Sequence, residues 1–400
     1  MTIREKKISQ KIALLSVSLL IVSSGAIAGN IPAISLANPT VNNILIETVV
    51  TLPSFFVILT VLLSPGLAKR FGYKATVMMG IALVFLTGII PVFFSSFWIL
   101  FATRIFFGIG IGMVNPLLYS FAGGMFQGRE LAAVIGFQSA FEGVGGMLTT
   151  FLVGQLMVFG WQKSFMVYGI ALPILLLFWF YVPDITVEQS TKSPEKSVRS
   201  EKQGDSFAML VVLLLVSVII YMSLSVKISG YLQYRSLGDG TDASNFLALV
   251  GAGAMTAGFT FGRLFAVLRK QIVVVAFSGM TMSLLLLAYG NHLWQMMLAR
   301  AAAGFSFRLF VPYALNQVNQ EMKNKEGKTA LLLVTFNLGA ALTPLVIGTL
   351  QRLFPSLIQA NLFVKEALVM IGLAVLLSLK RLSLFQRKDQ EEMKEEIEET

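Results

Sequence analysis

Charged side chains inside long apolar stretches are the first candidates for chemistry in this 400-residue chain. Burying a charged side chain in hydrocarbon costs about 2.5–3.5 kcal/mol or more of free energy, so such a residue is expected to have a structural or a functional role. Four cations and one acid lie deep within such stretches. The cations are Arg104, Lys227, Arg300 and Arg308, and the acid is Glu142.

The cations predict a site for a negatively charged ligand, because arginine binds carboxylate, phosphate and sulfate groups through paired hydrogen bonds. Arg308 lies farthest from either end of its stretch, so we assign it to the ligand. Lys227 could instead extend to the membrane surface. Arg104 and Arg300 could pair with carbonyls, and asparagines in the spans could serve packing. The expected substrate-binding residues are Arg308, Lys227, Arg300, Asn30, Asn115 and Gln138.

Glu142 is the expected proton-coupling residue, with Arg104 as its partner. Counting 1.5 Å per residue from the expected helix ends puts Glu142 ~16 Å and Arg104 ~20 Å above the same membrane face. A carboxyl group beside an arginine in a low dielectric can exchange protons near neutral pH. A permanently ionised structural pair is the alternative. Glu47 and Glu366 lie near helix ends, where we expect water to reach them.

The elements that would hold these residues are membrane-spanning helices. The chain is 56% apolar and 13% charged, whereas soluble domains carry about 25% charged residues. A helix needs about 20 apolar residues to cross a hydrocarbon core. Alternation with period two, typical of a membrane β-barrel, is absent, and we expect the first span to be retained. The twelve predicted spans are 12–35, 46–67, 75–94, 97–122, 131–154, 164–183, 207–231, 243–267, 272–290, 293–316, 329–350 and 362–380.

The two halves of the chain share a spaced pattern. Arg104, Gly108 and Pro116 return 196 positions later as Arg300, Gly304 and Pro312. Such internal duplication is common in secondary transporters, whose substrate sites lie near the bilayer midplane between the repeats. The predicted organisation is an N-terminal six-helix bundle (1–183), a cytoplasmic linker (184–206), a C-terminal six-helix bundle (207–380) and a charged cytoplasmic tail (381–400).

The basic charge of the chain, +10 in total, follows the predicted topology. If the N-terminus is inside, the outer segments hold only Lys163, Arg235, Arg352 and Lys365, and the remaining loop cations are cytoplasmic. This asymmetry is the positive-inside rule, and it predicts a cell-membrane protein with both termini in the cytoplasm. The charge therefore indicates topology and contact with membrane lipids rather than nucleic-acid binding.

A loop motif in the first half resembles the major facilitator superfamily. That family carries Gly-x-Leu-Ala-Asp-Arg-x-Gly-Arg-Lys between helices 2 and 3, and this chain reads Pro-Gly-Leu-Ala-Lys-Arg-Phe-Gly-Tyr-Lys over 65–74. Pro65 and Lys69 depart from the pattern, so a latch built on the family aspartate is not expected. The motif residues expected to serve conformational change are Gly66, Leu67, Arg70, Gly72 and Lys74.

The helix 4 pattern Arg-x-x-x-Gly of the same superfamily resembles Arg104 to Gly108. The Gly-Pro pair of its proton antiporters is missing from the fifth span. Further residues expected to serve conformational change are Gly108 in the fourth span and Gly143 and Gly146 in the fifth. The resemblance implies twelve helices in two pseudo-symmetric bundles and transport by rocking of the halves. It also implies a central site lined by helices 1, 4, 7 and 10.

Other classes of protein find less support in the sequence. No nucleotide loop, metal-ligand motif or nucleophile set appears, so we expect neither enzyme activity nor a cofactor nor a metal. We expect a monomeric, proton-coupled secondary active transporter of a small anionic or zwitterionic solute. Broad-specificity drug efflux is one alternative, favoured by the apolar spans. Flipping of a lipid or glycolipid is the other, with the basic site receiving a headgroup phosphate.

Overall fold

The computed structural model describes residues 3–126, 128–185, 204–321, 325–354 and 362–376, which form helices joined by short turns, with no strand among them. The first half consists of α1 (Ile3–Ile21), η1 (Ser23–Asn30), α2 (Ile31–Ala37), α3 (Asn43–Phe71), α4 (Tyr73–Ile89), η2 (Ile90–Val92), α5 (Phe97–Met125), α6 (Gly128–Leu156), η3 (Met157–Phe159), η4 (Lys163–Ile170) and α7 (Ala171–Tyr181). The second consists of α8 (Gly204–Tyr234), α9 (Gly240–Leu268), η5 (Arg269–Gln271), α10 (Ile272–Tyr289), α11 (Leu293–Glu321), α12 (Lys325–Leu353) and a helix over 362–376.

Ten segments of the described chain are helical, long and apolar enough to cross a membrane. Each of the twelve predicted spans overlaps a helix. Two of those helices fall outside the ten: α11, which carries Arg300 and Arg308, and the helix that is described only over 362–376. An all-α membrane fold is therefore confirmed, whereas the count of twelve spans stays a prediction.

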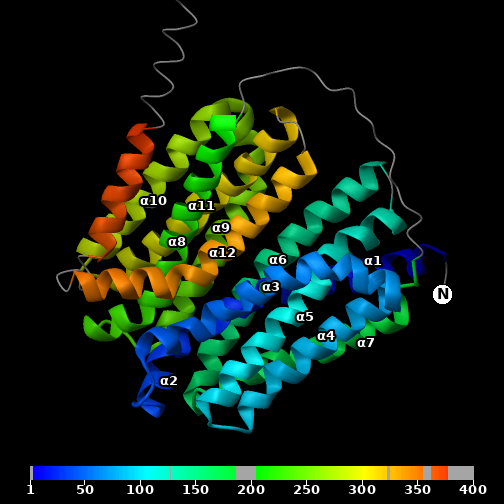
Figure 1. The fold of residues 1–400 in the computed structure, drawn as a ribbon, viewed down its shortest axis with the longest axis horizontal. Helices are drawn as coiled ribbons and strands as arrows, with labels where there is room; N and C mark the ends of the chain where they lie inside the picture. The colour runs from blue at the N-terminus through cyan, green and yellow to red at the C-terminus, as the bar shows by residue number, and fades with distance from the viewer. Residues whose placement is uncertain (1–2, 127, 186–203, 322–324, 355–361, 377–400) are drawn as a thin grey trace, which may run out of the picture.

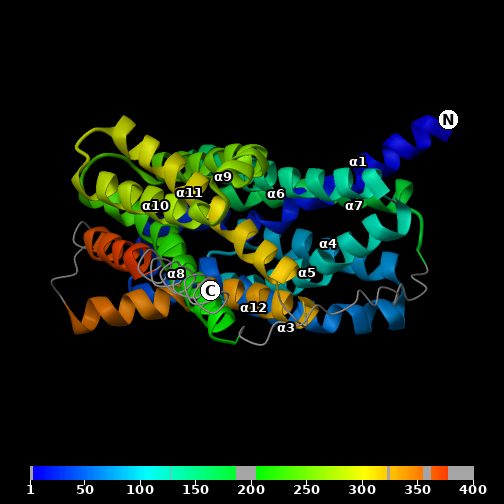
Figure 2. The ribbon, with the colours of Figure 1, turned by 90° about the horizontal axis from the view of Figure 1, so that it is seen from above.

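The helices form two bundles that follow the order of the chain (Figures 1 and 2). Buried apolar side chains between residues 13 and 182, joined by Val226, make one core. Those between 210 and 370 make a second. The predicted tail (381–400) and most of the predicted linker (184–206) lie outside the described residues, and the domain boundaries stay a prediction.

The two bundles meet at one end of the molecule. We call the end where α7 stops and α8 starts the linker side, and the opposite end the distal side. Near the distal side, Ser229 of α8 donates a hydrogen bond to the Gly29 carbonyl at 3.0 Å. Gln155 of α6 donates to Asn245 of α9 at 3.3 Å. The bundles converge towards the distal side and diverge towards the linker side (Figure 1).

Glycines set the spacing of helices within each bundle. A methyl group on Gly108 of α5 would collide with the backbone of Pro53 in α3. In the second bundle, a methyl group on Gly304 of α11 would collide with the backbone of Val250 in α9. Small residues let membrane helices approach closely in this way. The repeated glycine therefore fixes the helices that carry Arg104 and Arg300.

Candidate substrate and coupling site

Arg104 is fully buried inside the first bundle. Its guanidinium lies over the rings of Phe107, Phe165 and Tyr168, with the carbon 4.6, 5.1 and 5.2 Å from the ring centroids. Its Nη1 donates to the Tyr168 hydroxyl at 3.5 Å, and that hydroxyl donates to the Ser23 carbonyl at 3.0 Å. Cations are attracted to aromatic faces, more strongly where water is excluded. Arg104 thus holds α5, η4 and η1 together.

The predicted pair of Arg104 and Glu142 is wrong in its geometry. Glu142 of α6 accepts a hydrogen bond from the hydroxyl of Tyr119 at 3.4 Å. Tyr119 lies fifteen residues after Arg104 on α5, which is ~22 Å along the helix. The depth estimate failed because it assumed helices that start level and run parallel to the membrane normal.

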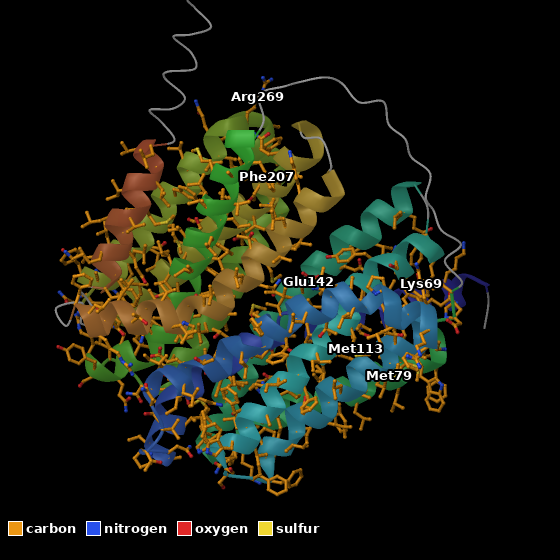
Figure 3. All side chains as sticks on the ribbon, in the orientation of Figure 1. Lys69, Met79, Met113, Glu142, Phe207 and Arg269 are labelled. Atoms are coloured by element: carbon orange, nitrogen blue, oxygen red, sulfur yellow. The ribbon has the colours of Figure 1, made fainter. Side chains whose placement is uncertain are left out.

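Glu142 instead lies within the electrostatic influence of a cation of the other bundle. The positive charge of Arg308 in α11 interacts with the Glu142 carboxylate and with the Tyr119 hydroxyl. Figure 3 shows Glu142 between the two bundles, with Lys69 and Arg269 at the linker-side ends of separate bundles. Glu142, Tyr119 and Arg308 therefore form a polar cluster to which both halves contribute, and we call it the central cluster.

Arg300 lies in the second bundle, 1% exposed. Its Nε, Nη1 and Nη2 atoms find no hydrogen-bond acceptor among the described residues. The nearby Tyr221 of α8 interacts electrostatically with Arg300 and with Arg308. The Tyr221 ring stacks on Phe307 of α11, with centroids 3.9 Å apart and planes at 8°. Because buried donors are normally satisfied, the unpaired guanidinium of Arg300 is a candidate to bind an acceptor that the chain itself does not supply.

Lys227 lies in an ion pair rather than at the membrane surface. Its Nζ lies 2.6 Å from a carboxylate oxygen of Glu47 in α3, so this pair joins the two bundles. Glu47 is 8% exposed and Glu366 is 5% exposed. The expectation that water reaches both acids is therefore wrong. Hydropathy placed them near helix ends, but packing of α3, α8 and the helix over 362–376 buries them.

The expected polar ligands have partners within their own bundle. Asn30 donates to the Ser164 hydroxyl at 2.6 Å, and Gln138 donates to the Leu118 carbonyl at 3.2 Å. Both are buried, so their side chains hold helices together in this arrangement. Asn115 is half-buried on α5. Binding of substrate by these three residues stays a prediction.

The loop motif occupies the linker side of the first bundle. Gly66 and Leu67 lie in the last turns of α3, followed by Arg70, whose exposed guanidinium lies over the Phe71 ring. Gly72 has φ of +92°, a conformation that glycine adopts without strain. Lys74 donates to the Trp179 carbonyl at 2.8 Å near the end of α7.

The glycines of α6 pack against other helices. A methyl group on Gly143 would press on the Met255 side chain of α9, in the other bundle. A methyl group on Gly146 would meet Val22, which precedes η1. Gly143 therefore lies where the bundles touch, and its expected role in conformational change stays a prediction.

Tyr119, Tyr221 and the buried acids were missed by sequence reasoning. Tyrosine is common in apolar spans, so nothing in the sequence marked the hydroxyl of Tyr119 as the hydrogen-bond donor to Glu142. One signal was available for the cation that pairs with these acids. Ser223, Lys227 and Tyr231 recur every four residues and so share one polar face of α8, which indicates that Lys227 faces protein rather than lipid. No group of three or more metal-binding side chains occurs within the described residues.

A sequence model of the Major Facilitator Superfamily matches residues 13–264, more than half of the chain. The chain belongs to this superfamily. With its many apolar helices it is a multi-pass membrane protein of a transporter family. No curated protein sequence matches the chain.

Solved transporter structures share the fold of this superfamily member. A mutant of the nucleoside transporter NupG is 13% identical, with a TM-score of 0.73, 94% of this chain covered and 100% of that one. A D-xylose-proton symporter is 14% identical, with a TM-score of 0.73 and coverage of 92% and 97%. The human organic anion transporter MFSD10 is 15% identical, with a TM-score of 0.64 and coverage of 94% and 100%.

Proposed function

We propose that this chain is a secondary active transporter that moves a small anionic or zwitterionic solute by alternating access. The observation that carries the proposal is the central cluster, where the charge of Arg308 in one bundle acts on Glu142 and Tyr119 of the other. A ligand bound there contacts both halves, so its binding can bias their relative position. Arg300 and Tyr221 extend the cluster along α11 and α8.

The charge of this region supports an anionic substrate group. Arg300 and Arg308 supply two guanidinium groups, and Glu142 supplies one carboxylate. Arginine binds carboxylates, phosphates and sulfates bidentately, and the free donors of Arg300 suit such a group. The similar folds are those of a nucleoside transporter, a sugar symporter and an organic anion transporter. Their substrates differ chemically, so the substrate must be argued from the residues of the site.

Proton coupling follows from competition for Arg308. An ionised Glu142 attracts the guanidinium of Arg308 and competes with the anionic group of a substrate for it. A protonated Glu142 is neutral, so the guanidinium is available to the substrate. Binding of proton and substrate then favour each other, as linkage requires. The role proposed for Glu142 is thus retained, with Arg308 rather than Arg104 as the cation that senses its charge.

The proposed cycle is a rocking of residues 1–183 against 207–380 by a monomer in the cell membrane. Contacts on the distal side, with helices that diverge towards the linker side (Figure 1), favour a state in which the distal side is closed. We assign the linker side to the cytoplasm, because Lys69, Arg70 and Arg269 lie there and cytoplasmic loops are rich in such residues.

Transport into liposomes tests this function. We expect a carboxylate, phosphate or sulfate solute to accumulate under a pH gradient without ATP. Glu142→Gln should abolish gradient-driven accumulation and leave solute exchange intact, and Arg308→Ala should raise the KM of anions about tenfold or more, as expected for a lost charge-assisted contact. Arg263→Ala, at an exposed cation of α9, is the matched control. The proposal fails if no solute moves under any gradient or if movement needs ATP. Cationic-dye export that survives Arg308→Ala would contradict the anion preference.

A further inference from the structure

A second set of buried charges lies away from the central cluster, towards the distal side. Lys227 of α8 pairs with Glu47 of α3 in the other bundle, at 2.6 Å. Glu366, on the helix over 362–376, lies within the same bundle as Lys227, whose charge also acts on it. One cation is therefore paired with a buried carboxyl group of the other bundle and acts at longer range on a second one in its own bundle. We call Glu47, Lys227 and Glu366 the distal triad.

The packing of α8 explains why Lys227 lies between the two acids. Ser223, Lys227 and Tyr231 share one face of α8 at intervals of four residues. The Tyr231 ring makes an edge contact with Phe363, at 5.1 Å between centroids, which seats the helix over 362–376 on this face. Glu366 follows Phe363 by one turn and so faces the level of Lys227 and Ser223.

The two acids differ in how they are satisfied. Glu47 has its ion pair with Lys227, although its second oxygen has no hydrogen-bond partner. The Ser223 hydroxyl is the nearest polar neighbour of Glu366, but neither carboxyl oxygen meets a donor among the described residues in good hydrogen-bond geometry, and the side chain is 5% exposed. An ionised carboxylate at this position is high in free energy, because it has lost its hydration and no ion pair or hydrogen bond compensates for that loss. A protonated carboxylic acid avoids that cost.

We propose that Glu366 is a proton-binding site that controls opening of the distal side, with Lys227 exchanging Glu47 for Glu366 as its partner. While the bundles touch distally, Lys227 pairs with Glu47 and Glu366 holds a proton. When the bundles part, α3 carries Glu47 away from α8, and Glu366 is the acid that remains beside Lys227. Glu366 then releases its proton to the aqueous phase on the distal side and pairs with Lys227.

The direction of the pH effect follows from this exchange. High pH removes the proton from Glu366, which favours its pairing with Lys227 and therefore favours distal opening. Low pH keeps Glu366 neutral, so that Lys227 stays in its ion pair with Glu47, and this pair favours closure of the distal side. Other elements packed around the triad add little charge: α2 and η1 carry no titratable side chain, and Arg352 of α12 and Lys365 are exposed.

The test measures the distal distance between the bundles directly. The chain has no cysteine, so Lys163→Cys and His292→Cys place spin labels only at two exposed distal positions, one in each half. Distances are recorded by double electron–electron resonance from about pH 5 to about pH 9, a range wide enough for strongly perturbed carboxyl groups. In the parent, we expect a longer-distance population that grows with pH.

The two carboxyl variants should move this population in opposite directions. Glu366→Gln mimics the protonated acid, so the distal side should stay closed at all pH values, with at least about a tenfold loss of the open population at high pH, a typical size for coupled equilibria. Glu47→Gln removes the partner from the closed state and should raise the open population. Glu130→Gln, at an exposed acid on α6, is the control and should behave like the parent.

The outcomes separate this proposal from the proposed function, on which it rests only for the existence of a distal-open state. A parent whose distal distance never changes would overturn both. A parent that opens with pH while Glu366→Gln keeps the same pH dependence would overturn the role of Glu366 alone. A change in the same direction for Glu366→Gln and Glu47→Gln would also overturn it, because a merely structural triad predicts the same sign for both. If Glu366→Gln does not fold, the pH dependence of Glu47→Gln decides, because opening that still grows with pH in that variant requires a second titrating acid near Lys227, whereas a pH-independent distance overturns the role of Glu366.

Discussion

Arg104 and Arg300 occupy equivalent positions of a duplicated pattern, yet their surroundings differ. Both are fully buried, and both precede by four residues a glycine that packs on the backbone of a neighbouring helix. Arg104 lies among three aromatic rings and reaches a tyrosine hydroxyl. The Nε and Nη2 of Arg104 find no acceptor among the described residues, and neither does any of the three guanidinium nitrogens of Arg300. The duplicated halves thus share helix packing but differ in how they satisfy a buried charge.

The difference assigns two tasks to one motif. The guanidinium of Arg104 lies over three rings and donates to a tyrosine, so it stabilises its bundle. The guanidinium of Arg300 has no hydrogen bond to the described residues, so all of its donors can serve an anion. The main contacts to an anionic substrate group are therefore expected from the second half of the chain, whereas the first half supplies Glu142.

The largest expected effect tests the feature that the halves share. Gly108→Leu and Gly304→Leu each force a side chain into the backbone of a neighbouring helix, so both should abolish the folded, monodisperse protein in detergent. Overpacking costs about 1–3 kcal/mol even where side chains can shift, and backbone shifts less readily. Size-exclusion chromatography of fluorescent fusions measures the outcome. Gly262→Leu is the control, because a side chain there enters open space. Tolerance of leucine in one half only would break the equivalence of the packing.

A smaller effect tests the feature in which the halves differ. Arg104→Ala and Arg300→Ala leave voids of the same size, but only Arg104→Ala also loses contacts with aromatic rings and Tyr168. We expect Arg104→Ala to be less stable than Arg300→Ala by about 2 kcal/mol, the order of a desolvated cation–π contact plus a hydrogen bond. Thermal unfolding without substrate measures the difference. An added anionic substrate should raise the Tm of Arg104→Ala but not that of Arg300→Ala. Equal stability of the two variants would contradict the comparison.

The smallest effect concerns single hydroxyl groups. Tyr168→Phe removes an acceptor from Arg104 and a donor from the Ser23 carbonyl, so a loss of about 1–2 kcal/mol is expected for these buried hydrogen bonds. Tyr221→Phe keeps the ring that stacks on Phe307 and should change stability by less than about 0.5 kcal/mol, as for substitutions that break no buried contact. Thermal unfolding of the two variants side by side checks this. A larger loss for Tyr221→Phe would show that its hydroxyl is structural.

The sequence predicted the helices better than their contacts. Hydropathy and the repeat located every described helix, because both depend on residue type along the chain. The partner of Glu142 depended on the tilt and rotation of α5 and α6, which hydropathy does not report. The pair of Lys227 and Glu47 depended on which side of the molecule is closed. Contacts between the halves differ from one conformational state to another, and the sequence alone does not indicate which state a given pair of residues belongs to.

The 3₁₀ stretch η1 gives the first span a further property. Its hydrogen bonds are poorer than those of an α-helix, and carbonyls at its two ends accept side-chain donors: Ser23 from Tyr168 and Gly29 from Ser229 of the other bundle. A 3₁₀ helix rises about 2.0 Å per residue against 1.5 Å in an α-helix, so rewinding these eight residues would shorten the span by ~4 Å. Such a contraction would pull on the aromatic neighbourhood of Arg104 and on the opposite bundle together. Through η1, a change in the length of the first span would therefore be transmitted both to the interior of the first bundle and to the facing surface of the second.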